Sequence, residues 1–177
     1  MKTLAQQMAV YNAYHQNDMN KATHFVGVPM IILGLLIPLS WPALEVGGVT
    51  VTAAMVFVGV VSLYYLMLDL PLGLLTAAAV LPLLWGAHLL AAQGAATGWI
   101  AFAVAFGGGW ILQLIGHGIE GRRPALVDNF FQIFVAPVFL VAEALFAFGA
   151  RAQLKREVEA LTVVKPVAPA RSPQAIQ

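Results

Sequence analysis

The chain has 177 residues, of which 60% are hydrophobic and only 10% are charged. Soluble domains carry about 25% charged residues, so this composition predicts an integral membrane protein of a single domain. A net charge of +1 gives no reason to expect a nucleic-acid partner, and a sequence without cysteine excludes disulfides and thiolate metal sites.

The polar N-terminal segment ends in "YHQNDMNKATHFVGVP", residues 14–29, and contains two of the four histidines of the chain. His15 and His24 are nine residues apart, which on one unbroken helix would place their rings on opposite sides. The turn-forming "QNDMN" between them predicts a bend, with an interfacial helix before it and Asn20 capping a helix that begins near Lys21. With the bend the two rings can converge; without it they are two surface histidines.

Four apolar stretches follow, each long enough for the roughly 20 residues that a membrane crossing requires. We predict transmembrane helices at about 25–40, 49–68, 72–92 and 98–116. The breaks between them have the composition of turns, namely "SWPALEVGG", "DLPLG" and "AAQGAATG". The fold class expected is an all-α membrane protein with four transmembrane helices.

A fifth apolar stretch, 129–149, contains Pro137, Gln132 and Glu143. A full crossing here would place the basic residues of the tail on the opposite side from Lys2 and Lys21, so we predict a re-entrant or interfacial helical hairpin broken near Pro137. The domain prediction is a membrane domain over 1–150, a charged surface helix over 151–165 and a disordered tail over 166–177.

The distribution of basic residues predicts the orientation. The N-terminus, the turn at 69–73 and the loop at 117–128 share one face and carry Lys and Arg, whereas the turns at 41–48 and 93–97 carry none. The positive-inside rule makes the basic face cytoplasmic, with both termini on that side. The Ala- and Gly-rich spans favour a bacterial inner membrane over an endoplasmic reticulum.

His117 belongs to the same face as His15 and His24, whereas His88 lies about 16 residues into its span, on the order of 24 Å away. Glu120 follows His117 at i+3, on the same helical face if the helix continues. Imidazoles with or without a carboxylate suit Fe(II), Zn, Mn or Ni. Glu120 is therefore either a ligand or the ion-pair partner of a neighbouring arginine.

Other polar residues at membrane depth are expected to be functional or paired. Glu143 and Asp128 are candidates for supporting the metal site through hydrogen bonds, for catalysis, or for ion pairs. Arg122 and Arg123 could grip a substrate carboxylate, or anchor the protein at phospholipid headgroups.

Two blocks of sequence carry a resemblance to a known family. "YNAYHQNDMNKATHFVGVP" and "GWILQLIGHGIEGRRPALVDNFFQIFVAPVFLVAEALF", within residues 8–150, resemble the membrane-bound 2-hydroxy fatty acid dioxygenases. The resemblance implies an Fe(II)-dependent enzyme that uses O2 to convert a 2-hydroxy fatty acid to an acid one carbon shorter. His15, His24 and His117 match the histidines of the family, and His88 has no clear counterpart. Tyr14, Asn20 and Gln113 belong to the matching positions and are further candidates for the site.

The partners expected are a 2-hydroxy fatty acid, O2 and membrane lipids, and a homo-oligomer is possible. Three alternatives remain open: a zinc-dependent membrane hydrolase, a membrane protein that binds haem between two histidines, and a non-enzymatic lipid-binding protein. A membrane di-iron hydroxylase has less support, because such sites generally use about eight histidines and this chain has four.

Overall fold

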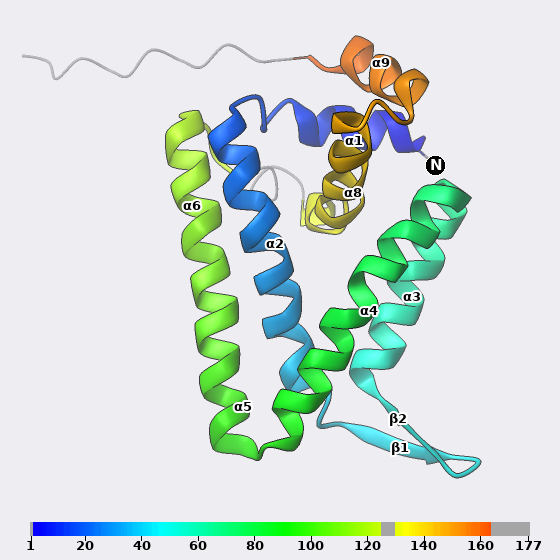
Figure 1. Ribbon diagram of the computed structural model, residues 1–177, viewed down its shortest axis with the longest axis vertical. Helices are drawn as coiled ribbons and strands as arrows, with labels where there is room; N and C mark the ends of the chain where they lie inside the picture. The colour runs from blue at the N-terminus through cyan, green and yellow to red at the C-terminus, as the bar shows by residue number, and fades with distance from the viewer. Residues whose placement is uncertain (1, 125–129, 164–177) are drawn as a thin grey trace, which may run out of the picture.

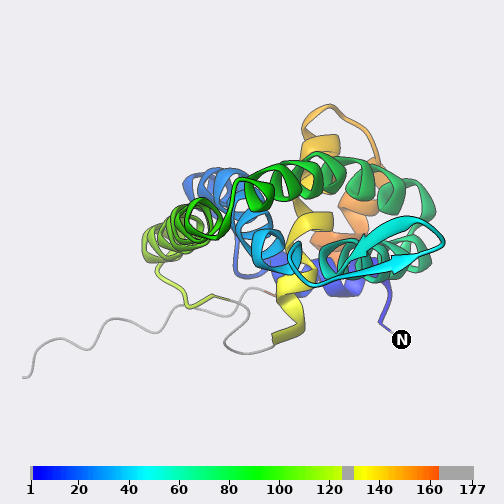
Figure 2. The ribbon, with the colours of Figure 1, turned by 90° about the horizontal axis from the view of Figure 1, so that it is seen from below.

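In the computed structural model, which describes residues 2–124 and 130–163, long helices run side by side in a bundle (Figure 1). Three helical segments are long and apolar enough to cross a membrane. They are α2 (Asp18–Leu39), α4 (Leu70–Ala92) and a continuous helix made of α5 (Ala95–Phe102), the π-helical η1 (Ala103–Gly107) and α6 (Gly108–Glu120). Seen along the bundle, α2 lies between α6 and α4 (Figure 2). α3 (Ala53–Leu68) packs against α4 but has only 16 residues.

The shorter α3 results from a β-hairpin, which corrects the all-α expectation. Strand β1 (Ala43–Val46) pairs antiparallel with β2 (Val49–Thr52), joined by Gly47 and Gly48 at positive φ. Two glycines in this conformation are what a tight hairpin turn requires, and the β-branched "VTVT" suits a strand. Residues 49–52 therefore belong to β2 and not to the predicted second span.

α2 begins earlier than predicted, because Asn17 and not Asn20 is its N-cap. The Asn17 side chain accepts hydrogen bonds from the backbone N–H groups of Met19 and Asn20. The predicted bend between the two histidines is confirmed, since α1 (Leu4–Asn12) and α2 are separate helices, although the last three residues of "QNDMN" already belong to α2. Asn20 lies inside α2, which frees its side chain for a role in the site described below.

Glycines allow α2 and α6 to approach closely. A Cβ at Gly27 would lie 3.0 Å from the Gly109 carbonyl, and a Cβ at Gly116 would lie 2.1 Å from Oγ1 of Thr23. Small residues at such contacts are typical of helix pairs in membranes, where close backbone approach drives association. This contact sets the register of α2 against α6, the two helices that carry His24 and His117.

The C-terminal part begins with a 3-10 helix, η2 (Phe130–Phe134), followed by α8 (Ala136–Ala147) and α9 (Ala152–Leu161). Pro137 lies in the first turn of α8, where a missing N–H breaks no helical hydrogen bond, so the predicted break falls between η2 and α8. At 12 residues, or about 18 Å, α8 is too short to cross a hydrocarbon core. α9 falls within the predicted surface helix, whereas the predicted tail over 166–177 lies outside the described residues.

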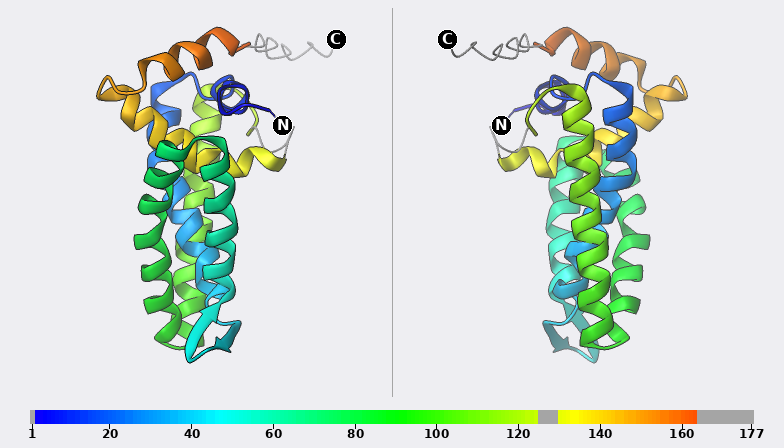
Figure 3. Two further views of the ribbon diagram at one scale, coloured as in Figure 1. Left: turned by 90° about the vertical axis from the view of Figure 1, so that its right-hand side faces the viewer. Right: turned by 90° about the vertical axis from the view of Figure 1, so that its left-hand side faces the viewer.

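One end of the bundle, which we call the head end, gathers α1, α9, the end of α6 and the junction of α3 and α4 (Figures 1 and 3). α1 lies across this end. The buried side chains of Leu154 and Val158 of α9 belong to an apolar core that also contains buried residues of α1 and α8. Asp69 caps α4 and also forms an ion pair with Arg151, which ties the start of the α8–α9 connection to the bundle. The hairpin and the turn between α4 and α5 lie at the opposite end (Figure 1).

Candidate metal centre

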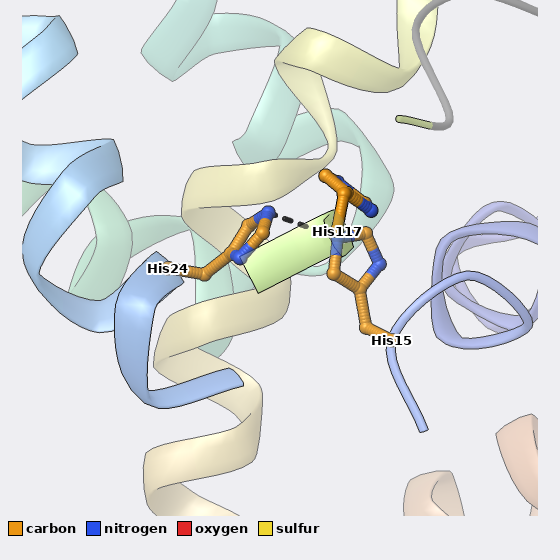
Figure 4. A group of neighbouring side chains, drawn as sticks. All are labelled: His15, His24 and His117. Atoms are coloured by element: carbon orange, nitrogen blue, oxygen red, sulfur yellow. Dashed lines mark hydrogen bonds between the residues drawn. The ribbon is translucent and has the colours of Figure 1, made fainter. Parts of the chain in front are cut away.

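Three histidines meet beneath α1 at the head end. His15 lies in the connection between α1 and α2, His24 in the second turn of α2, and His117 in the last turn of α6. Their side chains point toward one another (Figure 4), and one ring nitrogen of each lies within 4.8 Å of the others. All three are buried, with exposed fractions of 1%, 3% and 5%. The sequence prediction that these three histidines converge is confirmed.

Backbone hydrogen bonds fix the protonation of two of the rings. Nδ1 of His15 donates to the Tyr11 carbonyl at 2.7 Å, and Nδ1 of His24 donates to the Asn20 carbonyl at 2.8 Å. A neutral imidazole carries only one ring proton, so each ring presents an unprotonated Nε2. This is the usual arrangement of histidines that bind metal through Nε2.

The two Nε2 atoms face each other at 3.0 Å (Figure 4), which places two lone pairs in direct contact. A proton or a metal cation between the two nitrogens would relieve this repulsion. Burial, together with the nearby His24, lowers the pKa of His15 far below its usual range, which disfavours the proton. Ligands about 2.0–2.1 Å from one ion lie roughly 2.9–3.4 Å apart at 90–109°, so the observed separation fits a shared metal.

His117 completes the cluster. Its ring centroid lies 4.9 Å from that of His15 and 5.0 Å from that of His24. Its Nδ1 is buried and has no hydrogen-bond partner within the described residues. Such an orphaned nitrogen is costly unless a ligand satisfies it. Just beyond, Gly121 adopts φ 71° and ends α6, which returns the chain toward the α1–α2 connection.

Glu120 joins α6 to the α1–α2 connection. Its carboxylate accepts hydrogen bonds from the backbone N–H groups of Gln16 and Asn17, at 3.1 and 2.8 Å, and from Nδ2 of Asn20 at 3.2 Å. Asn20 Nδ2 also donates to the Tyr14 carbonyl. The carboxylate therefore fixes the segment that follows His15. Because it accepts three hydrogen bonds from the protein, its role is to support the histidine ligands.

A small apolar cavity of about 80 Å³ opens beside the three histidines. Apolar side chains from α2, α6, η2 and α8 form most of its lining, including Val28, Ile31, Trp110 and Ile133. Tyr11, Gln113 and Gln132 also line it and, with the histidines, supply the polar groups. An apolar cavity with a few convergent polar groups is the usual form of a small-molecule site.

The other predicted site residues lie around this core. Glu143 on α8 forms an ion pair at 2.8 Å, one of the three roles considered for it, and the partner is Lys21 of α2. Nη1 of Arg122 donates to the Ala13 carbonyl, and Arg123 is exposed nearby. Asp128 lies outside the described residues. His88 is exposed on α4 and does not belong to the histidine cluster, as its depth predicted.

Two residues at the site, Tyr11 and Gln132, were not among the predicted site residues. Tyr11 stacks on His15 with ring centroids 4.0 Å apart and an angle of 8° between the rings. Its position four residues before His15 was a signal in the sequence, because on a helical turn the Tyr11 carbonyl can accept a hydrogen bond from the His15 ring. Gln132 is buried against the cavity, and a glutamine within an apolar stretch was a signal of this role.

Comparisons with known proteins place these residues in a family. The family model described as "2-hydroxy-palmitic acid dioxygenase Mpo1-like" matches residues 1–148. This chain belongs to the Mpo1-like family. It is 36% identical over 159 residues to the 2-hydroxy-palmitic acid dioxygenase MPO1 of Saccharomyces cerevisiae, over 88% of this chain and 87% of the yeast protein. No solved structure matches the chain.

The Mpo1-like match covers α1 to the end of α8 and includes all three clustered histidines. It thus confirms the family that the two sequence blocks indicated. The yeast relative is named as a dioxygenase of 2-hydroxy-palmitic acid.

Proposed function

We propose that this Mpo1-like protein is an Fe(II)-dependent dioxygenase that performs the α-oxidation of 2-hydroxy fatty acids to acids one carbon shorter. The observation that carries the proposal is the His15–His24 contact, in which two unprotonated Nε2 atoms lie 3.0 Å apart beside His117. Three imidazoles suit iron, zinc, copper or nickel, and the named activity of the yeast relative favours iron.

His15, His24 and His117 would hold the metal, and the carbonyls of Tyr11 and Asn20 keep two of the rings aimed. Bound Fe(II) supplies the ability to activate O2 and to accept oxygen ligands from the substrate. Three protein ligands leave coordination positions open for both, which is the usual logic of non-haem iron oxygenases. Glu120 and Asn20 position the α1–α2 connection, and Glu143 supports α2 through Lys21.

The amphipathic form of the substrate accounts for the location of the site. The polar head of a 2-hydroxy acid would lie against the histidines, and its alkyl chain would extend along Val28, Ile31 and Ile133. Arg122, Arg123 and Tyr14, which lie at the head end, would guide the carboxylate toward the site. The ring of Tyr11, stacked on His15 and in contact with Phe139, would keep water from the metal.

The reaction balances with O2 as its sole oxidant. The C1–C2 bond breaks, C1 leaves as CO2, and C2 becomes the new carboxyl carbon, with one water formed for each O2 consumed. Four electrons pass from the two carbons to O2, so no reductant or 2-oxo acid is required.

The same three ligands would also suit a zinc hydrolase, which differs in its independence of O2. A haem held between two histidines has less support, because axial nitrogens at about 2 Å from iron lie on opposite sides of the macrocycle. The 3.0 Å contact between the Nε2 atoms leaves no room for one.

Metal analysis and oxygen uptake of the purified protein test the proposal. We expect iron bound to the chain, and conversion of 2-hydroxypalmitate to pentadecanoate with matching consumption of O2. Removal of iron should abolish the conversion. Addition of Fe(II) under anaerobic conditions, followed by exposure to O2, should restore the conversion. A protein that carries zinc alone, or turns over equally without O2, would refute the proposal.

A further inference from the structure

Buried polar atoms without a partner are concentrated at the cavity. Within the described residues, four such side-chain atoms occur: Asn20 Oδ1, Gln113 Nε2, His117 Nδ1 and Gln132 Oε1. Three of the four residues line the cavity, and the two glutamines are 95% and 96% buried. Native proteins leave few buried polar groups unpaired, and each one calls for an explanation.

The two glutamines approach the cavity from different elements. Gln113 lies one helical turn before His117 on α6, on the same helical face. Its amide nitrogen lies against Gly27 of α2, where a Cβ would come within 2.7 Å of it. Gln132 comes from η2, between α6 and α8 in the chain. Each of these two cavity-lining residues thus carries one buried amide atom without a partner among the described residues, a donor on α6 and an acceptor on η2.

This combination is poorly suited to an alkyl chain but suited to the head of a 2-hydroxy acid. A carboxylate only accepts hydrogen bonds, whereas a hydroxyl can donate one. Gln113 Nε2 can donate to the carboxylate, and Gln132 Oε1 can accept from the 2-hydroxyl. Neither need is met by the methylene groups that follow.

We propose that Gln132 is the specificity-determining residue that recognises the 2-hydroxyl of the substrate, while Gln113 binds its carboxylate. This inference rests on the proposed function. A site with a buried group that pairs with a substrate hydroxyl rejects an analogue lacking that hydroxyl, because the group is then left unpaired. The product is such an analogue, so the loss of the hydroxyl also favours its release.

Anaerobic binding to the iron-loaded protein tests the inference without turnover. Calorimetry would compare 2-hydroxypalmitate with palmitate for the wild type and for Gln132→Met, which keeps the length of the side chain but removes the amide. We expect the wild type to prefer the hydroxy acid by about ten-fold or more, and Gln132→Met to lose most of that preference. Gln113→Met should weaken both acids to a similar degree.

Gln153→Met on the exposed face of α9 is the matched control, and it should leave both affinities unchanged. Gln132→Leu provides a second replacement if Gln132→Met does not fold, and iron content verifies that the centre is intact in each variant. An unchanged preference in an iron-loaded Gln132 variant would overturn the inference while leaving the proposed function standing. A wild-type protein that binds neither iron nor 2-hydroxypalmitate would overturn both the inference and the proposed function.

Discussion

At the scale of single residues, the positions and tautomers of the histidines depend on hydrogen bonds made with other residues. The carbonyls of Tyr11 and Asn20 fix the tautomers of His15 and His24, and Glu120 fixes the backbone that follows His15. Loss of such supporting contacts usually costs about 10–100-fold in metal affinity. The ligands and their supports can therefore be separated by substitution.

Replacement of His15, His24 or His117 by Ala should lower metal affinity by at least about 100-fold, more than the loss of a supporting residue, and abolish turnover. Metal content after gel filtration and O2 uptake would measure both. His88→Ala is the control, because His88 is exposed on α4, away from the cluster. The His88→Ala protein should retain its iron. Equal loss in the His88 variant would contradict the assignment of the ligands.

Glu120→Ala should reduce metal affinity by about 10–100-fold without eliminating it, because two hydrogen bonds to the α1–α2 connection and one to Asn20 of α2 disappear while all three imidazoles remain. Titration with Fe(II) would measure the change. Glu157→Ala on the exposed face of α9 is the matched control. A complete loss of metal from Glu120→Ala would instead indicate that the carboxylate is itself a ligand.

At the scale of elements, the contact between α2 and α6 aligns two of the three ligands. Gly116→Ala should destabilise the protein by about 1–3 kcal/mol, because its Cβ would lie 2.1 Å from Thr23 Oγ1 and 2.4 Å from Asn20 Oδ1. Thermal unfolding in detergent, with metal content alongside, would measure the effect. Gly118→Ala, two residues later, meets nothing within 4 Å and should be neutral or stabilising. Equal stability of the two variants would contradict the close contact.

Much of the element order was predictable from the sequence, and the errors have identifiable causes. The bend between His15 and His24 followed from turn-forming residues, but Asn17 and Asn20 are equally good caps, and local sequence does not choose between them. The hairpin was missed because a short apolar, β-branched run can extend either a span or a strand. The partners of Glu120 lie about 100 residues away in sequence, beyond the reach of any local pattern.

At the scale of the whole molecule, the basic residues and the metal centre share one end. Lys21, Arg122 and Arg151 belong to the head end, whereas the hairpin end has neither Lys nor Arg in 41–52 or 93–97. We expect the head end in the cytoplasm, by the positive-inside rule. The substrate head would then be bound from the cytoplasmic side of the membrane.

The natural absence of cysteine makes this orientation directly testable. Single cysteines introduced as Val46→Cys in β1 and Glu157→Cys in α9 occupy exposed positions at opposite ends. An impermeant maleimide should label Val46→Cys in intact bacterial spheroplasts and Glu157→Cys only after permeabilisation. The reverse pattern would place the head end outside. Labelling of neither before permeabilisation would rule out a crossing between them.

The pair of facing nitrogens at His15 and His24 has a consequence for the life of the protein in the cell. Without an ion, their lone pairs repel each other across 3.0 Å in a buried setting that resists protonation. A ligand that binds only the folded form adds to its stability in proportion to the logarithm of its concentration. A newly inserted chain that has not received its metal is thus expected to open more often at the α1–α2 connection and to be degraded sooner. Metal supply would then govern how many copies persist, as well as how fast each one works.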